Sequence, residues 1–281
     1  MSVRGLMQRN GAVVVGGAYN AISASLVEKA GFDAIWLSSF GVSIAERALP
    51  DVNLITLSEM LQVGRNMVAS VEIPVIADCE NGYGDINNTM HTVREFERAG
   101  ILAVCIDDNQ YPKRCSLFDH ADRQLIPQAE MIAKIKAAKD VQRSADFTFI
   151  ARTEALIAAC GISECIDRSS AYLEAGADLL AIHSKVWPDL LQVLERWKAP
   201  DSLVVIPTMF PEIDLLDLRN AGFKVIIYAN QAIRASLKAM DEVLSKLRKT
   251  GRADEVEADI LPLAKLHELV RFQDVRSNGR H

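Results

Sequence analysis

Eight short runs of aliphatic and β-branched residues recur along the chain, and a segment with helical periodicity separates each run from the next. Strands that alternate with helices are typical of βαβ units and predict a parallel sheet. Eight such units suit a closed cylinder, which has no exposed edge strand, so the pattern favours a (βα)₈ barrel of the TIM type over an open doubly wound sheet. The runs cover residues 12–19, 34–39, 74–80, 103–109, 147–153, 179–185, 203–209 and 224–230.

An Ala-Gly pair precedes four of these runs, at residues 30–31, 99–100, 175–176 and 221–222. Glycine at the end of a helix can adopt the left-handed conformation that terminates it. The four pairs therefore predict the same turn from helix to strand four times.

No shift in composition and no linker divides the chain, so we expect one barrel domain over residues 1–281. Two segments exceed what a barrel needs. Residues 107–127 are too long for a simple connection and predict a gating loop. Residues 242–281 are charged and amphipathic, and predict extra C-terminal helices that pack on the barrel or on another subunit.

The composition argues against several classes of partner. The net charge is −6 and there is no basic tract, which disfavours nucleic acid and anionic membranes and favours a small-molecule site. The first residues lack the apolar region of a signal peptide, and no run approaches the ~20 apolar residues that span a bilayer, so we expect a cytoplasmic protein. Five cysteines without a Cys-x-x-Cys spacing predict reduced thiols.

Polar side chains close the predicted strands. In a (βα)₈ barrel the carboxyl ends of the strands form the active site, so these side chains should converge. Each one alone could cap a helix or form a surface ion pair, but together they make a ring of acids with one arginine and one histidine. They are Tyr19, Ser38, Ser39, Asp78, Glu80, Asp107, Asp108, Arg152, Glu154, His183, Lys185, Thr208 and Asn230.

The acids predict a metal site. Residues 74–85 read as a buried strand that ends in a glycine-rich loop, and Asp78 and Glu80 lie two residues apart, so both can face one cation. The alternative for this segment alone is a solvated strand end. Together with Asp107 and Asp51 the acids carry more negative charge than can stand close together without a cation, which indicates Mg²⁺ or Mn²⁺ held largely through waters. Ligands that are all oxygen argue against zinc.

Arg152 and His183 complement this charge. The arginine fork suits a phosphoryl or carboxylate group, so the expected substrate is a small 2-oxo acid with two or three negative charges. A metal chelated by such an acid would stabilise the enolate that forms when a neighbouring bond breaks.

With these residues assembled, residues 10–245 resemble the phosphoenolpyruvate mutase and isocitrate lyase superfamily. The resemblance rests on segments such as IPVIADCENGYGD, PKRCSL, FIARTEALIA and YANQAIRAS, and those after residue 145 resemble the branch that handles phosphonopyruvate. It implies a barrel whose last helix is exchanged between subunits of a homodimer or homotetramer.

The resemblance also implies roles for individual residues. The metal would be bound by Asp78, and through waters by Glu80 and Asp107. The substrate would contact the loop of Ser38, Ser39 and Phe40, and its phosphoryl group would contact Arg152 and His183. The catalytic residues would be Asp51 and the gate residues Lys113, Cys115 and Ser116, with Leu117 also at the substrate.

The sequence departs from the mutase pattern at three points. Asp-Asp-Asn stands at 107–109 in place of Glu-Asp-Lys, Cys115-Ser116 replaces Asn-Ser, and Glu80 stands where aspartate is usual. Lys113 and Arg114 favour a Cys115 thiolate that could act as an acid or nucleophile; the alternative is a passive residue that touches the substrate.

The departures leave the reaction open. A proton-donating Cys115 implies a carbon–carbon lyase of the isocitrate or methylisocitrate type. A Cys115 that only packs implies phosphoenolpyruvate mutase or phosphonopyruvate hydrolase chemistry, and the match of the carboxy-terminal half favours this branch. Within the branch we favour the mutase, because hydrolysis also needs an ordered water that the gate admits. A binding protein without catalysis is a fourth alternative, which the retention of Asp78, Arg152 and His183 disfavours.

Overall fold

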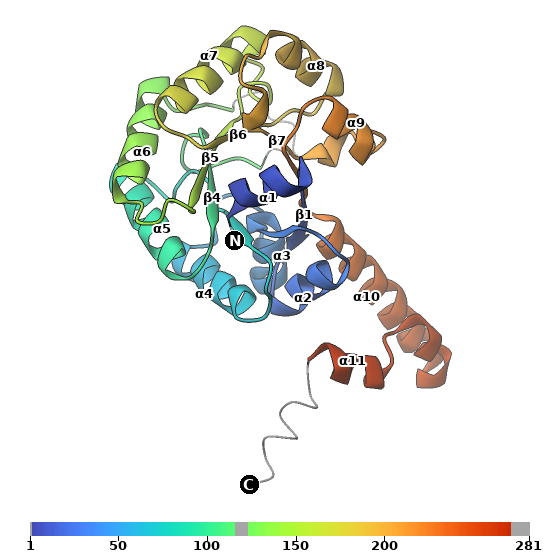
Figure 1. Ribbon diagram of the computed structural model, residues 1–281. Helices are drawn as coiled ribbons and strands as arrows, with labels where there is room; N and C mark the ends of the chain where they lie inside the picture. Colours follow the sequence, from blue (N-terminus) through green and yellow to red (C-terminus); the bar gives the residue numbers. More distant parts are fainter. Residues whose placement is uncertain (1, 116–122, 271–281) are drawn as a thin grey trace. The chain divides into compact units, whose positions relative to one another are not determined.

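A computed structural model describes residues 2–115 and 123–270 of the chain (Figure 1). Eight parallel strands pair in sequence order, and β8 pairs with β1 to close the barrel. The predicted (βα)₈ barrel is therefore confirmed, and every predicted run contains one strand. The strands are β1 (Val13–Ala18), β2 (Ala34–Leu37), β3 (Val75–Asp78), β4 (Ala103–Asp107), β5 (Thr148–Thr153), β6 (Leu179–Ile182), β7 (Leu203–Val205) and β8 (Val225–Tyr228).

Helices α2 to α9 lie around the strands, and α1 lies across one end of the barrel (Figure 1). They are α1 (Val3–Asn10), α2 (Ala21–Lys29), α3 (Ser39–Arg47), α4 (Leu57–Val68), α5 (Ile86–Arg98), α6 (Gln128–Val141), α7 (Gly161–Glu174), α8 (Trp187–Arg196) and α9 (Leu215–Asn220). Short 3₁₀ turns span Pro200–Ser202 and Pro207–Met209. The four predicted glycine turns are present, because Gly31, Gly100, Gly176 and Gly222 all have φ between 84° and 109°.

Two apolar layers hold the barrel together. One lies between strands and helices, and the other fills the interior with alternate residues of the strands, such as Val15, Ile76 and Ile227. Val3 and Leu6 of α1 belong to the interior cluster, so this helix packs against the amino-terminal end of the barrel. The helix covers that end of the barrel, and the predicted polar side chains lie at the opposite end, where the strands finish.

Residues after Asn230 form a second compact unit. Within residues 231–270 the structure has α10 (Gln231–Thr250), 3₁₀ turns at Ala253–Glu255 and Glu257–Asp259, and α11 (Leu263–Leu269). The helical extension predicted to begin at 242 therefore belongs to a helical unit that begins at Gln231. The expectation of one domain over residues 1–281 stays a prediction.

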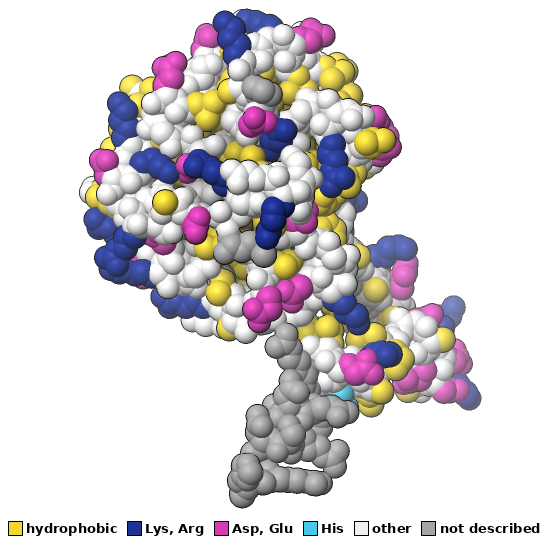
Figure 2. Space-filling model, viewed as in Figure 1, with side chains coloured by type: hydrophobic (Ala, Val, Ile, Leu, Met, Phe, Trp, Pro, Cys, Tyr) yellow, Lys and Arg dark blue, Asp and Glu magenta, His cyan; other side chains and the backbone are white. Residues whose placement is uncertain are grey.

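The surface matches the acidic, mixed composition. Acidic and basic side chains are interspersed over the barrel face in Figure 2, without one large basic patch there. Among the described residues, no helix is both long enough and apolar enough to span a membrane.

Gly17 provides a test of barrel closure. A Cβ atom built on Gly17 would lie 2.1 Å from the backbone oxygen of Ala229, so an alanine would push β1 away from the end of β8. We expect Gly17→Ala to lower the free energy of unfolding by about 3 kcal/mol in urea denaturation, as overpacking of a tight core does. Gly5→Ala is the control, because its Cβ would meet only the Ser2 hydroxyl at 3.3 Å and alanine favours the helix by about 1 kcal/mol. Equal effects of the two changes would contradict the role given to Gly17.

Candidate active site

Strand alternation places the predicted residues on the inner face of the barrel. Successive side chains of a strand point to opposite faces, so residues two apart share a face. Ile76 of β3 fills the interior, and Asp78 follows it on the same face. The same rule places Asp107 after Cys105, Arg152 after Ile150 and His183 after Ala181. Four strands thus deliver two acids, an arginine and a histidine to one mouth.

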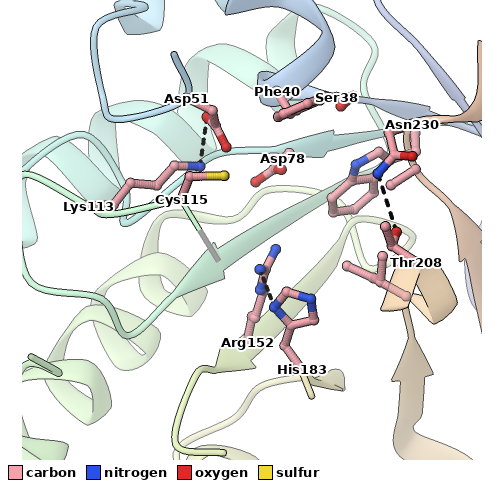
Figure 3. Close-up of a pocket in the computed structure, with 13 residues that line it drawn as sticks. Ser38, Phe40, Asp51, Asp78, Lys113, Cys115, Arg152, His183, Thr208 and Asn230 are labelled. Carbon is pink, nitrogen blue, oxygen red and sulfur yellow. Dashed lines mark hydrogen bonds and ion pairs between the residues drawn. The ribbon is translucent and has the colours of Figure 1, made fainter. Parts of the chain in front are cut away.

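Three of these side chains, Asp78, Arg152 and His183, border a cavity of about 60 Å³ at the carboxyl ends of the strands. At roughly 10–15 Å³ for each water, the cavity has room for a few waters or an equally small ligand. Asp51, Lys113 and Cys115 lie together on one side, Arg152 and His183 lie on another, and Asp78 lies between them (Figure 3). The lining of the cavity also includes Trp36, Ser38, Phe40, Ile206, Thr208, Ala229 and Asn230.

The acidic side holds more negative charge than its basic partner balances. Lys113 is buried, its Nζ lies 3.0 Å from Oδ1 of Asp51, and it also pairs with Glu80. Burial opposes the charged lysine, but Asp51 and Glu80 raise its pKa. Burial raises the pKa of Glu80, and Asp51 and Asp78 raise it further. Burial also raises the pKa of Asp107 to about 6, against the effect of Arg152 and Lys113.

This excess of carboxylates fits a divalent cation bound through oxygen. Asp78 Oδ2 accepts a hydrogen bond from the Ser39 hydroxyl at 3.0 Å, and its Oδ1 accepts one from the Glu80 amide at 3.3 Å. In the part of the chain that the structure describes, no three Asp, Glu, His or Cys side chains converge on one point. A cation held here by Asp78 would therefore take most of its ligands from water or substrate, as the sequence predicts.

The basic side is organised by a buried carboxylate. Glu154 Oε1 accepts from Arg152 Nε at 2.6 Å and lies 2.8 Å from Nδ1 of His183. The same Nδ1 lies 2.7 Å from Arg152, so it can donate to Glu154 or accept from Arg152, but a neutral ring cannot do both. Burial lowers the pKa of His183 and keeps the ring neutral, while Glu154 opposes that shift. Glu154 therefore orients both side chains that face the cavity.

A buried lysine shapes the loop after β3. Lys134 of α6 donates to the carbonyl oxygens of Asn81 at 2.9 Å and Gly84 at 2.7 Å. Between β3 and α5 the chain takes positive φ at Glu80 and Tyr83, at 56° and 60°, which is unfavourable for side-chain-bearing residues. Lys134 thus holds the carbonyls of a strained loop that carries Glu80.

The remaining predicted residues have mixed positions. Ser38 lines the cavity, and its hydroxyl accepts from the Gly41 amide at 3.1 Å as the N-cap of α3. Phe40 and Cys115 also line the cavity, whereas Glu80 and Asp107 lie outside its lining. Ser116 and Leu117 lie outside the described residues, as does the centre of the predicted gating loop. The described ends of that loop pair at Asn109 and Leu125.

Sequence reasoning missed several residues of this site. Glu154, Thr208 and Asn230 were found at strand ends but received no role, although Asn230 Nδ2 lies 3.4 Å from Thr208 Oγ1 at the cavity. Trp36 carried no polar signal at a strand end, and Lys134 lies inside a helix. Only tertiary contact reveals these last two.

Comparisons with known proteins agree with this geometry. Residues 3–248 match the family model described as phosphoenolpyruvate phosphomutase. The phosphonopyruvate hydrolase of Variovorax sp. (strain Pal2) is 38% identical, over 92% of this chain and 90% of that enzyme.

Two solved structures have the same fold. A phosphoenolpyruvate phosphomutase from Streptomyces platensis subsp. rosaceus superposes with a TM-score of 0.95 and 40% identity, over 98% of this chain and 96% of that one. A phosphonopyruvate hydrolase in complex with oxalate and Mg²⁺ superposes with a TM-score of 0.90 and 34% identity, over 99% and 98%.

Asp107 gives a pH-dependent test of the acidic side. Its native pKa of about 6 lies above the value of about 4 in an unfolded chain, so its contribution to stability is full below pH 4 and is lost as the pH rises through 6. In buffer with a chelator, Asp107→Asn should raise the free energy of unfolding by up to about 3 kcal/mol at pH 8 and about half that at pH 5. The exposed Asp146→Asn serves as control. A gain that does not depend on pH would contradict the shifted pKa.

Proposed function

Because the chain belongs to the phosphoenolpyruvate phosphomutase family, we propose that it rearranges the carbon–phosphorus bond between phosphonopyruvate and phosphoenolpyruvate. The observation that carries the proposal is the division of one small cavity into two sides. Arg152 and His183 offer hydrogen-bond donors on one side, and Asp78 offers carboxylate oxygens on the other. A phosphonate with an adjoining 2-oxo acid carries charge at both of its ends and suits such a cavity.

The phosphoryl end would bind Arg152, whose planar guanidinium suits two phosphoryl oxygens at once. Glu154, Asp107 and Asp78 raise the pKa of Arg152 in spite of its burial, so the arginine stays charged in the cavity. With Nδ1 accepting from Arg152, a neutral His183 carries its proton on Nε2 and can donate a further hydrogen bond without adding a second full charge. Phosphoryl transfer needs mainly positioning and charge stabilisation, which these two side chains supply.

The oxo-acid end would bind near Asp78 and the start of α3. Ser38 and Phe40 line the cavity there, and amides at the first turn of a helix attract anions. Asp78 would hold Mg²⁺, or Mn²⁺, with Glu80 and Asp107 contributing through waters; when bound, the ion would polarise the oxo group. The related hydrolase solved with oxalate and Mg²⁺ supports both parts of this assignment.

On the acidic side, Lys113 and Asp51 would lie near the oxo-acid end of the bound substrate. Their ion pair holds the Lys113 ammonium beside Glu80 and within the cavity lining. An ammonium there can stabilise the negative charge that develops on the oxo-acid end when the carbon–phosphorus bond breaks.

Two other reactions fit the same cavity. A water admitted beside the phosphoryl group would give pyruvate and orthophosphate, which is the hydrolase reaction of the Variovorax relative. The position of Cys115 favours a further candidate, because its side chain is 2% exposed and borders the cavity beside Lys113 (Figure 3). A thiol there could protonate an enolate released by a carbon–carbon lyase.

We further propose a cytoplasmic homodimer or homotetramer. Leu237, Met240 and Leu244 of α10 recur at helical spacing and are 43%, 50% and 62% exposed. Such an apolar stripe on one face of a helix is costly in water and suits contact with a neighbouring subunit.

Phosphorus-31 NMR of the protein with Mg²⁺ and phosphonopyruvate tests the proposal. We expect the phosphonate signal to be replaced by that of phosphoenolpyruvate. Orthophosphate would instead assign the hydrolase, and an unchanged spectrum would reject both phosphonate reactions.

Asp78→Asn should reduce turnover by at least about a hundredfold, because a cation site loses its charged ligand. Full turnover by this variant would refute the metal assignment.

Cys115→Ala separates the phosphonate reactions from the lyase. If the thiol only packs in the cavity, phosphonopyruvate turnover should fall by no more than about tenfold, the effect of one lost contact. A loss of about 10³-fold with unchanged substrate affinity would instead indicate proton transfer by the thiol. Cys160→Ala, at an exposed position, is the matched control.

A further inference from the structure

Among its contacts with the described residues, Arg123 makes three buried hydrogen bonds next to the cavity. Its side chain is 3% exposed and comes from the segment between β4 and α6. One guanidinium nitrogen donates to Glu154 Oε2 at 3.2 Å and lies 3.4 Å from Asn109 Oδ1. The other donates to the carbonyl oxygen of Cys115 at 2.8 Å. Arg123 therefore bridges the main chain at Cys115 and the carboxylate of Glu154.

The two oxygens of Glu154 are divided between different partners. Oε1 receives Arg152 and contacts His183, whereas Oε2 receives Arg123. A carboxylate that is held at both oxygens cannot rotate about its last bond without breaking a charge-assisted hydrogen bond. Arg123 thus fixes the plane of the carboxylate that orients the two cavity-facing side chains.

The same guanidinium acts on the opposite wall of the cavity. Cys115 lines that wall, and its carbonyl has Arg123 as a charged donor. Arg123 directly precedes a pair of strand-like contacts, in which the Gln110 amide donates to the Gln124 carbonyl at 3.0 Å and the Ile126 amide donates to the Asp108 carbonyl at 2.9 Å. Its backbone is therefore well anchored, and its side chain can hold both walls in register.

We propose that Arg123 is a positioning residue that sets the Cys115 wall and the Arg152–His183 wall of the cavity at the same time. The proposal rests on the proposed function only for the role of Arg152 and His183 in binding the anionic end. A planar fork is needed, because two nitrogens of one group must reach two acceptors in fixed directions. A lysine can pair with Glu154 but cannot reproduce this fork.

Alkylation of the cysteines by iodoacetamide, read by mass spectrometry, tests the bridge in the absence of substrate. Cys115 is buried together with Cys79, Cys105 and Cys165, whereas Cys160 is exposed and gives the rate of a free thiol. In Arg123→Lys the Cys115 rate should rise by about tenfold, the worth of one charge-assisted hydrogen bond. The rates of the other three buried thiols should stay unchanged.

Two results would overturn the proposal. An unchanged Cys115 rate would mean that the bridge does not hold this wall. A parallel rise at all four buried thiols would mean that Arg123 supports the barrel generally. Arg98→Lys is the matched control, because Arg98 is half exposed and pairs with Glu95 on the outer helix α5.

Steady-state kinetics with phosphonopyruvate and Mg²⁺ then separate positioning from binding. Arg123→Lys keeps a cation beside Glu154, so KM should stay within about threefold while kcat falls about tenfold. Arg123→Met leaves Glu154 Oε2 without this donor, so KM should rise about tenfold as well. Equal changes of kcat and KM in the two variants would contradict the separation between positioning by the guanidinium fork and pairing with Glu154. If the wild type does not turn over phosphonopyruvate, the proposed function fails, but the thiol rates still decide the role of Arg123.

Discussion

The uncompensated negative charge at the mouth of the barrel is the constraint on which the rest of the site depends. Asp51, Asp78, Glu80 and Asp107 come from different loops and strands, and Lys113 is the cation that pairs with two of them. Burial makes this arrangement costly in the free protein, as the raised pKa of Asp107 indicates. The proposed cation and anionic ligand would complete the charge balance and would link the acids to the arginine and histidine opposite.

The side of the cavity formed by Arg152 and His183 contains a buried carboxylate that stays ionised. Glu154 is fully buried, and burial alone would raise its pKa, but Arg152 and His183 lower it, so the carboxylate stays ionised. Its charge serves two neighbours at one oxygen and Arg123 at the other. Removing one partner from such a network leaves a buried charge without its counter-charge, which lowers the stability of the whole network. The contributions of its members are therefore coupled.

Much of this could be predicted from the sequence because strand alternation is a local rule. The eight runs, the four glycine turns and the inward placement of Asp78, Arg152 and His183 all follow from spacing. Lys134 and Arg123 could not be found in this way. Each acts on residues that lie far away in the chain, on Asn81 and Gly84 or on Cys115 and Glu154, and no periodic pattern marks such pairs. The roles of Ser116 and Leu117 stay predictions.

The packing of α1 against the amino-terminal end of the barrel affects how molecules travel. Val3 and Leu6 belong to the apolar cluster that fills the barrel interior, so packed side chains lie beneath the cavity at the strand ends. Among the described residues, the cavity lies at the carboxyl ends of the strands with Lys113 and Cys115 in its lining, so the proposed reactant and product would both occupy that end of the barrel. Under the proposed function, a product that has not left this cavity would exclude the next reactant, so the two would compete for the same space.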